Sequence, residues 1–424
     1  MKIEEIELKN FKAFSDVKIP LDCKSAVFFG INGMGKTSLL RTINLLYAKI
    51  INQAVNRKEL KQKYNVELDD IRYGTSETEI KGMFVLGKKS SIEYRLGMTR
   101  KDGKRTHDKE SLDKIAEHIQ KSYFSDELQE NIPIFVNYGT NRLVLDIPLR
   151  IKMHHEFDVY SAYEKAIENR IDFRTFFEWF RNQEDIENAE KVTTGNLNYE
   201  DKSLKAVKNA ILAMLPDFTS LHIARKPRLA MMVEKDGVSL NVSQLSDGEK
   251  CVMALLGDLA RRLAIANPLL ANPLEGSGVV LIDEIELHMH PSWQRKILKI
   301  LKETFPNVQF IITTHSPQVL GELDENYKIF ALTHKDGDTF AKEISQMNGF
   351  DSNYILEEFM ETKSINQDFQ KLLDEANEAI SDNEFDRAER EIEKVRKIAG
   401  LNSAAAIELE ENLKRGLWLH EKNH

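Results

Sequence analysis

The sequence predicts an α/β protein that has a mixed and largely parallel sheet with helices, a helical insertion and an α-helical C-terminal region. Three observations support this fold class. An apolar strand, SAVFFG, runs into a glycine-rich loop and then a helical pattern. Two more apolar strands, VVLIDE and QFIITTH, flank a helical segment, and such alternation is typical of parallel sheets. Beyond Gly349 the pattern is helical throughout.

The N-terminal part begins with IEEIELKNF and VKIPL, whose alternation of charged and apolar residues predicts two edge-type strands. The strand SAVFFG and a helix from Thr37 follow. Residues 79–98 predict a hairpin, and TRKDGKRTHDK after them a charged turn. IPIFVNYGTNRL at 132–143 predicts a strand that ends in a polar loop. We therefore expect residues 1–150 to form one lobe with a hairpin insertion.

The remaining chain divides into three parts by its patterning. Residues 151–215 are mostly helical, with an interruption at TTGNLNYED. Residues 216–350 begin with a strand pair around 220–242 and continue as alternating helices and strands. Residues 351–424 are helical and are expected to form an interaction domain. Its first two helices predict an αα-hairpin through two apolar faces, one formed by Phe369, Leu372, Leu373, Ala376 and Ile380 and the other by Phe385, Ala388, Ile392 and Val395.

The composition bounds the class of protein. The 424 residues are 42% hydrophobic, which is ample for a core, and the net charge of −9 argues against a chain coated all over for nucleic acid. Only two cysteines occur, Cys23 and Cys251, and they are far apart, which suits a reducing cytoplasm. The N-terminus lacks the apolar core of a signal peptide, and no run approaches 18 apolar residues. We expect a cytoplasmic protein without a membrane span.

GINGMGKT at 30–37 matches the pattern G-x-x-x-x-G-K-[ST] between a strand and a helix, which predicts a phosphate-binding loop. Glycines let the backbone curl so that its N–H groups point at a phosphate, Lys36 adds a positive charge, and Thr37 offers a hydroxyl to Mg²⁺. The plain alternative is a glycine-rich turn. The residues expected to hold ATP are Gly30, Ile31, Asn32, Gly33, Met34, Gly35, Lys36, Thr37 and Ser38.

Polar residues also follow two of the apolar strands. Asp283 and Glu284 come directly after a buried strand, where open α/β sheets place their ligands. We expect Asp283 to hold Mg²⁺ and Glu284 to polarise the attacking water. His315 ends the strand QFIITTH and is expected to reach the γ-phosphate as a hydrogen-bond donor. The alternatives are an acidic turn and a structural histidine.

LSDGEK at 245–250 opens another long helix. Ser246 fits an N-cap and Glu249 completes a capping box, which explains both residues locally. Ser246 and Gly248 also stand at a helix start, whose free N–H groups suit a phosphate.

In this order, GINGMGKT, LSDGEK, VVLIDE and TTH resemble the motifs of ABC-type ATPase heads of the SMC/RecF-like branch, over about residues 1–350. The resemblance implies a head-to-tail dimer that encloses two ATP molecules. Ser246 and Gly248, with Glu249 beside them, would contact the ATP of the second subunit. The glutamine that usually contacts Mg²⁺ has no clear counterpart, and the loop NYGTNR at 137–142 is its expected place. The residues that would act on their own subunit's ATP are Lys36, Thr37, Asp283, Glu284 and His315.

A closer resemblance covers nearly the whole chain. RKPRLAMMVEKDGVSLNVSQLSDGEK, LARRLAIANP, VVLIDEIELHMHPSWQR, FPNVQFIITTHSPQV and GFDSNYILEEF are similar to the ATPase subunit of the Septu antiphage system (PtuA-like) and its retron-associated relatives. The resemblance implies a partner, an HNH-type endonuclease that the ATPase restrains or licenses. This chain contains no H-N-H pattern.

Four segments allow other interpretations. His288 and His290 lie beside Asp283 and could suggest a metal cluster, but we favour packing. HKDGDTF at 334–340 contains the D-x-D of an added Toprim nuclease, although a hairpin turn between NYKIFAL and FAKEI is more economical. Residues 88–109 carry eight Lys or Arg against three Asp or Glu, so DNA contact and a solvated hairpin face stay equally open. The helices from 366 to 424, with fourteen acids and nine bases, could cap the head or dock a partner, and we favour docking.

The sequence thus predicts an ATP-binding and ATP-hydrolysing subunit of an antiphage defence complex, an ATP-gated dimer that regulates a nuclease. The first alternative is a DNA-repair or recombination ATPase that clamps DNA. The second is the ATPase subunit of a transporter, against which the Asp-Gly-Glu in LSDGEK and the N-terminus argue.

Overall fold

The computed structural model describes residues 1–87, 90–124, 132–142, 157–360, 366–400 and 403–423. These residues form two compact units, Met1–Phe350 and Asp351–His424. The finer division of the first unit at residues 150 and 215 stays a prediction.

A six-stranded sheet in the first unit carries the strand ends that matter for the site. Its order is β14-β13-β3-β12-β11-β7, and all neighbours are parallel except the pair β13 and β14. β3, β7, β11 and β12 are buried along their whole length, as apolar strands between two layers must be. The strands are β3 (Ser25–Phe29), β7 (Ile134–Tyr138), β11 (Gly278–Ile282), β12 (Val308–Thr314), β13 (Tyr327–Lys335) and β14 (Asp338–Ile344).

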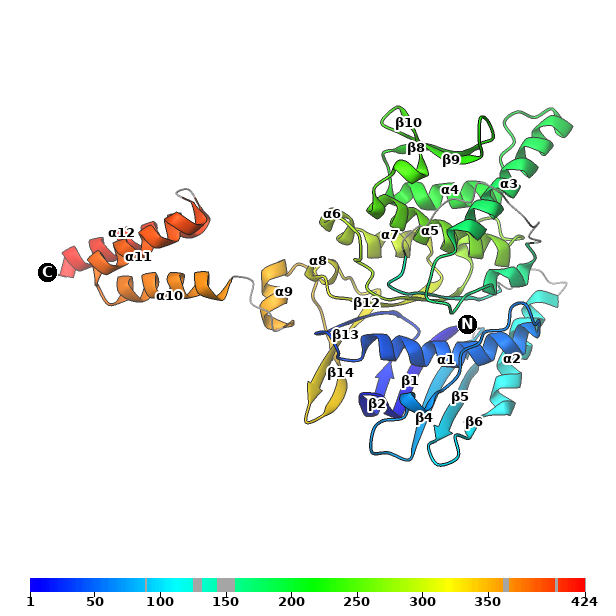
Figure 1. The fold of residues 1–424 in the computed structure, drawn as a ribbon, viewed down its shortest axis with the longest axis horizontal. Helices are drawn as coiled ribbons and strands as arrows, with labels where there is room; N and C mark the ends of the chain where they lie inside the picture. The colour runs from blue at the N-terminus through cyan, green and yellow to red at the C-terminus, as the bar shows by residue number, and fades with distance from the viewer. Residues whose placement is uncertain (88–89, 125–131, 143–156, 361–365, 401–402, 424) are drawn as a thin grey trace. The chain divides into compact units, whose positions relative to one another are not determined.

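A second sheet is antiparallel and five-stranded, in the order β2-β1-β4-β5-β6. It lies together with helix α1 on one side of the six-stranded sheet, whereas α3, α4 and α5 lie on the other side (Figure 1). The predicted hairpin is confirmed as β4 and β5, whereas the segment predicted as a charged turn contains a short strand, β6. The elements are β1 (Lys2–Phe11), β2 (Phe14–Pro20), α1 (Lys36–Val55), η1 (Leu68–Asp70), β4 (Glu77–Leu86), β5 (Ser90–Thr99), β6 (Arg105–His107) and α2 (Lys109–Phe124).

The main core lies between these two sheets. Phe28, Leu281 and Phe330 from the six-stranded sheet pack in one cluster with apolar side chains of β1, β4 and α1, and all three are at most 2% exposed. Burial of such side chains contributes about 1.5–3 kcal/mol each relative to exposure. This core fixes the loop between β3 and α1 against the strand ends of β11 and β12.

Helices and a small sheet cover the other face. Helix α3 crosses α5 closely, because a Cβ at Gly257 would lie 2.9 Å from the ring of Phe176. The predicted strand pair around 220–242 is a three-stranded sheet in the order β10-β9-β8. These elements are η2 (Val159–Tyr163), α3 (Phe173–Thr194), α4 (Lys202–Met214), β8 (Phe218–Ala224), β9 (Ala230–Lys235), β10 (Val238–Asn241), η3 (Val242–Gln244), α5 (Asp247–Ala266), η4 (Pro273–Glu275), α6 (Pro291–Gln294), α7 (Ile297–Thr304) and α8 (Pro317–Leu320).

The second unit is helical, as predicted. The two expected apolar faces meet, but a third helix completes their core with Ala406, Leu409 and Leu413. The αα-hairpin of α10 (Gln367–Ser381) and α11 (Phe385–Ala399) therefore shares a three-helix core with α12 (Ala404–Asn423). The short helix α9 (Ser352–Glu358) precedes these three helices. Together the two units confirm the predicted fold class of mixed and parallel sheets with helices and a helical C-terminal region.

Candidate functional site

The loop between β3 and α1 has the shape of a phosphate cradle. Gly30, Gly33 and Gly35 all have positive φ, at 149°, 85° and 87°. A Cβ at Gly30 would lie 2.5 Å from the carbonyl oxygen of Leu332, and one at Gly35 would lie 2.9 Å from the ring of Phe14. Only glycine fits at these two positions. Ile31, Asn32 and Met34 lie in the exposed or half-exposed part of the loop, and helix α1 follows with its free N–H groups.

Lys36 is the first residue of α1, and its ammonium bends back over the loop. Its Nζ donates hydrogen bonds to the carbonyl oxygens of Gly30 at 2.8 Å and Ile31 at 3.0 Å. Burial lowers the pKa of Lys36, while the carboxylates of Glu284 and Asp283 oppose that effect. The ammonium of Lys36 therefore lies between the glycine loop and the acidic end of β11, where it would bind a phosphate.

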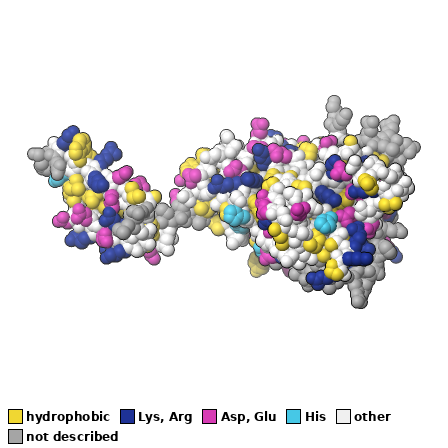
Figure 2. Space-filling model, turned by 90° about the horizontal axis from the view of Figure 1, so that it is seen from above, with side chains coloured by type: hydrophobic (Ala, Val, Ile, Leu, Met, Phe, Trp, Pro, Cys, Tyr) yellow, Lys and Arg dark blue, Asp and Glu magenta, His cyan; other side chains and the backbone are white. Residues whose placement is uncertain are grey.

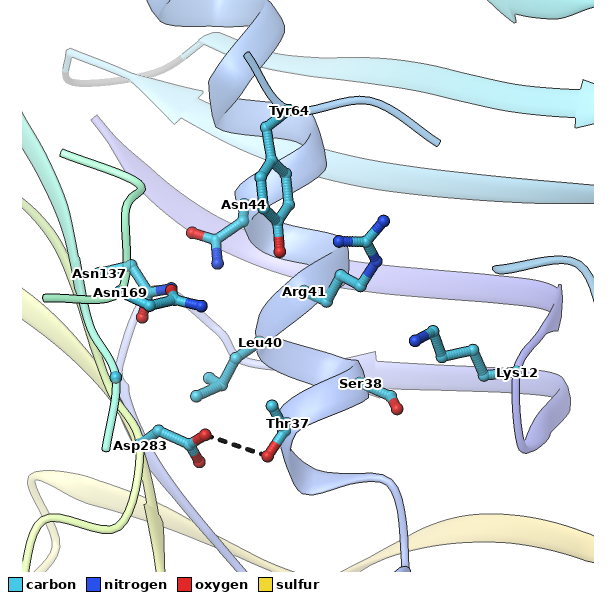
Figure 3. A pocket seen from close by; sticks show the side chains of 11 residues that line it. Lys12, Thr37, Ser38, Leu40, Arg41, Asn44, Tyr64, Asn137, Asn169 and Asp283 are labelled. Atoms are coloured by element: carbon cyan, nitrogen blue, oxygen red, sulfur yellow. Dashed lines mark hydrogen bonds between the residues drawn. The ribbon is translucent and has the colours of Figure 1, made fainter. Parts of the chain in front are cut away.

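Thr37 and Asp283 come together although 246 residues separate them in sequence (Figure 3). The Thr37 hydroxyl donates to Asp283 Oδ2 at 3.0 Å, and the Thr313 hydroxyl donates to Asp283 Oδ1 at 2.5 Å. The N–H of Asp283 donates to the carbonyl of Tyr138 at 2.9 Å, which fixes the carboxylate at the end of β11. A hydroxyl and a carboxylate are hard oxygen ligands, so these two side chains fit Mg²⁺.

A cavity of about 240 Å³ opens beside this pair. Two of its walls carry unsatisfied acceptors, because Asn44 Oδ1 and Asn137 Oδ1 are buried and have no hydrogen-bond partner. Asn137 and Gly139 place the start of the loop 137–142 in the wall next to Asp283, although which residue contacts magnesium stays a prediction. The lining residues are Lys12, Thr37, Ser38, Leu40, Arg41, Asn44, Tyr64, Asn137, Gly139, Asn169 and Asp283.

Most of the residues that line this cavity were not predicted from the sequence. Arg41 and Asn44 follow Thr37 at helical spacings of four and seven, so their position on the same face of α1 was readable. Tyr64 carries no comparable signal, and only the fold brings it against Arg41, whose guanidinium lies 4.8 Å from its ring centre. Asp70 holds the same guanidinium through two hydrogen bonds of 2.6 and 2.8 Å.

Glu284 and His315 face each other at the ends of β11 and β12. Glu284 Oε1 lies 3.9 Å from His315 Nε2, and both side chains are about one-third exposed, at 34% and 28%. Burial, followed by the charge of Lys36, lowers the pKa of His315, so its imidazole is neutral at pH 7 and can donate one hydrogen bond. The structure therefore brings both predicted residues to the edge of the sheet that carries Lys36 and Asp283.

Glu286 is a site residue that the sequence did not single out. Its carboxylate accepts hydrogen bonds from the Thr314 hydroxyl at 2.7 Å and from the N–H of His315 at 2.6 Å. These contacts fix the turn after β12 and hence the place of the imidazole. Its position as the third carboxylate of DEIE was the only available signal.

The residues of LSDGEK form a closed turn of their own. The Ser246 hydroxyl donates to Glu249 Oε2 at 2.7 Å and accepts from the Glu249 N–H at 3.3 Å, which completes the predicted capping box. Lys235 binds the other carboxylate oxygen of Glu249 at 2.6 Å. Burial would raise the pKa of Glu249, but Lys235 and Ser246 outweigh it and lower the pKa.

Gly248 touches the segment after Glu284. A Cβ there would lie 2.6 Å from the carbonyl oxygen of His288, so the helix start needs glycine. Among the described residues, the cavity beside Thr37 is lined without Ser246, Gly248 or Glu249. Any contact of this turn with a nucleotide on a second subunit stays a prediction.

The two alternative metal and nuclease motifs have structural roles. His290 caps α6 by accepting from the Ser292 N–H at 3.2 Å. Within the described ranges, no group of three or more His, Cys, Asp or Glu residues could hold a metal ion. The D-x-D segment is the turn of the β13–β14 hairpin, as the sequence predicted, and Asp338 pairs with Arg72 at 3.1 Å.

Some basic side chains of residues 88–109 make hydrogen bonds within the fold. Arg100 and Arg105 donate to the backbone carbonyls of Ile71, at 2.9 Å, and Val66, at 2.8 Å. Residues 88 and 89 lie outside the described residues. Figure 2 shows the side of the first unit that carries α3, α4 and β8–β10, not β5 and β6, and on that side basic and acidic side chains are interspersed. No helix among the described residues has the length and apolar character needed to cross a membrane.

The chain is similar to several known proteins. A family model described as "AAA domain, putative AbiEii toxin, Type IV TA system" matches residues 25–321, which include every motif from the glycine loop to His315. A solved structure of an SMC head bound to the C-terminal winged-helix domain of ScpA covers 81% of this chain and 98% of that chain, with 17% identity and a TM-score of 0.49.

Two curated relatives carry names from defence systems. The retron Ec83 probable ATPase of Escherichia coli is 31% identical over 85% of this chain and 76% of that protein. The Septu protein PtuA of Bacillus mycoides is 25% identical over 84% of this chain and 44% of that protein. The predicted resemblance to Septu and retron-associated ATPases is thereby confirmed. The chain belongs to the AAA-domain family described by the matching model, and it is a homologue of the retron-associated probable ATPases.

Proposed function

We propose that the chain is the ATP-binding and ATP-hydrolysing subunit of an antiphage defence complex, and that its nucleotide state controls an associated HNH-type nuclease. The observation that carries this proposal is the contact between Thr37 and Asp283, which are 246 residues apart in sequence and meet beside the glycine loop. The resemblance to Septu and retron-associated ATPases supports the defence role.

Each residue of the site has a role in this proposal. The loop from Gly30 to Gly35 binds the phosphates through its N–H groups, and Lys36 adds a positive charge. Thr37 and Asp283 would hold Mg²⁺, which neutralises phosphate charge when bound. Glu284 accepts a proton from the attacking water, and the neutral imidazole of His315 donates a hydrogen bond to the γ-phosphate.

The proposal includes a head-to-tail dimer in which Ser246 and Gly248 contact the nucleotide of the second subunit. Glu284→Gln keeps the shape of the side chain but removes its basicity, so it should accumulate the ATP-bound dimer. Light scattering with ATP measures this directly. Ser246→Ala should bind ATP as a monomer but dimerise more weakly than the wild type, and a dimer that forms as tightly as in the wild type would contradict the role of Ser246.

The nuclease arm is tested by looking for an HNH nuclease gene beside the gene of this chain, co-expressing the two proteins and following DNA cleavage as ATP is varied. Lys36→Ala should abolish the ATP dependence of cleavage. Lys299→Ala, which changes an exposed cation on α7 outside the site, is the control and should leave that dependence unchanged. Cleavage that is indifferent to both ATP and Lys36→Ala would contradict the gating proposal.

A further inference from the structure

Arg142 lies in the loop 137–142 after β7, and it is buried behind the acidic end of β11. Its side chain is only 1% exposed. One nitrogen, Nη2, donates to the backbone carbonyl of Asp283 at 2.9 Å and also to the carbonyl of Glu284. Arg142 therefore contacts the peptide groups on both sides of Glu284 rather than any carboxylate.

The backbone at Glu284 needs this support. Glu284 has φ of 49°, in the left-handed region, which is unfavourable for a non-glycine residue. The pairing of β11 with β12 and β7 ends at Ile282, so the carbonyls of the next two residues lie beyond the sheet. The N–H of Glu284 is held by the Thr313 hydroxyl at 2.8 Å. Nη2 of Arg142 donates to both carbonyls, and the carbonyl of Glu284 also accepts from the Leu287 N–H at 3.0 Å, so the turn is held on both sides of Glu284.

Burying the guanidinium of Arg142 at this position is energetically unfavourable. Its Nε and Nη1 are buried and have no hydrogen-bond partner, and an unsatisfied buried donor is destabilising. Burial also lowers the pKa of Arg142, and the carboxylates of Glu286, Asp283 and Glu284 oppose that effect. A position with a purely structural role would be filled at lower cost by an apolar side chain. The buried guanidinium of Arg142 therefore points to a role in the candidate site.

The loop from Tyr138 to Arg142 holds the acidic turn at both of its ends. At its start, the Tyr138 carbonyl accepts from the Asp283 N–H at 2.9 Å. At its end, Arg142 binds the carbonyls of Asp283 and Glu284. Between these points Gly139 lines the cavity beside Thr37. A movement of this loop on the side that faces the cavity would therefore also displace the backbone of Glu284.

We infer that Arg142 is a positioning residue for the proposed hydrolysis: it holds Glu284 in its left-handed turn so that the carboxylate stays directed toward His315 and the nucleotide. This inference rests on the proposed function. Arg142 does not itself line the cavity beside Thr37, and it acts through the backbone carbonyls of Asp283 and Glu284.

The test compares Arg142→Met with the wild-type full-length chain. We expect kcat for ATP hydrolysis to fall at least about tenfold, because a misplacement of about 1 Å can cost about 100-fold. The affinity for a fluorescent ADP analogue should stay within about twofold, since the loop that binds phosphate through Lys36 is untouched. Arg105→Met is the matched control, because Arg105 also donates to a backbone carbonyl but lies on β6, and it should leave kcat unchanged.

A double-mutant cycle separates positioning from general destabilisation. In a Glu284→Gln background, Arg142→Met should lower the residual rate by less than about twofold, since the group it positions is already disabled. A further tenfold loss there would overturn the inference. If Arg142→Met does not fold, Arg142→Lys carries the test, because it keeps the charge and a donor. It should restore part of kcat, and equal losses of kcat and ADP affinity would overturn the inference.

The same measurements distinguish this inference from the proposed function. If the wild-type chain hydrolyses no ATP, the proposed function fails and the inference fails with it. If the wild-type chain hydrolyses ATP and Arg142→Met keeps its kcat, only the inference is overturned.

Discussion

The substitution Asp258→Asn probes an ion cluster in the middle of α5. The carboxylate of Asp258 accepts hydrogen bonds from Arg261 and Arg262, both at 2.7 Å, and from the Tyr138 hydroxyl at 2.8 Å. Asp258 and both arginines are at most 1% exposed. Burial would raise the pKa of Asp258, but Arg262 and Arg261 outweigh it and hold the pKa far below its usual value.

Asparagine keeps the shape of the side chain and removes its charge, so two buried guanidinium groups lose their counter-charge. Removing one partner of a buried ion pair typically destabilises a protein by about 3–5 kcal/mol. Arg262 keeps two carbonyl acceptors, those of Ala162 and Glu164. We therefore expect a loss near the lower end, about 3 kcal/mol in the free energy of unfolding.

Urea denaturation followed by tryptophan fluorescence measures this loss. Trp179 on α3 is 2% exposed and Trp418 is 53% exposed, so the shift in emission reports mainly on the first unit. Glu110→Gln on α2 is the control, because the pair of Glu110 with Lys114 is exposed and should leave the midpoint unchanged. A loss below about 1 kcal/mol with an unchanged urea dependence would refute the expected cost.

The pH dependence gives a second check. The pKa of Asp258 is lower in the folded than in the unfolded chain, so its contribution is present above about pH 4 and is lost as the pH falls. The difference in unfolding free energy between wild type and Asp258→Asn should therefore shrink below about pH 4. A difference that is constant down to pH 2 would contradict this assignment.

Three further predictions concern the site. Thr37→Val should remove most of the gain in nucleotide affinity that Mg²⁺ gives, measured by calorimetry with and without EDTA, and an unchanged gain would contradict the role of Thr37. Gly30→Ala should lower nucleotide affinity at least about tenfold, or about 1.4 kcal/mol, because its Cβ would lie 2.5 Å from the Leu332 carbonyl oxygen. Since the pKa of His315 is lowered, its imidazole is already neutral at pH 7. The hydrolysis rate should therefore show no histidine titration between pH 7 and 8. A step in the rate in that range that disappears in His315→Asn would refute this prediction.

The sequence predicted the parts of the site that depend on short-range pattern. Lys36 and Thr37 belong to one contiguous motif, and Asp283 follows an apolar strand whose end is readable. Parallel strands bring their carboxyl ends to one edge, so the meeting of Asp283 with Thr37 follows from the alternation of strands and helices. The capping box at Ser246 was likewise readable from its spacing.

The parts that were missed depend on long-range packing. Arg142 lies in a loop with no periodicity, and its contacts to the carbonyls of Asp283 and Glu284 exist only once β7 pairs with β11. Tyr64 reaches the cavity through a segment without a regular pattern. The strand β6 was taken for a turn because its three residues, Arg105–His107, are all exposed and show no alternation.

The closed turn at Ser246 has a consequence for how quickly two subunits could separate. Its hydroxyl proton is already engaged with the Glu249 carboxylate, in a hydrogen bond of 2.7 Å. A phosphate that arrives from a second subunit competes with that carboxylate for the same proton, so one hydrogen bond is exchanged for another. Such an exchange contributes little net free energy, on the order of 1 kcal/mol. The turn would thus recognise a phosphate without holding it tightly, and its own glutamate would favour release once that phosphate leaves.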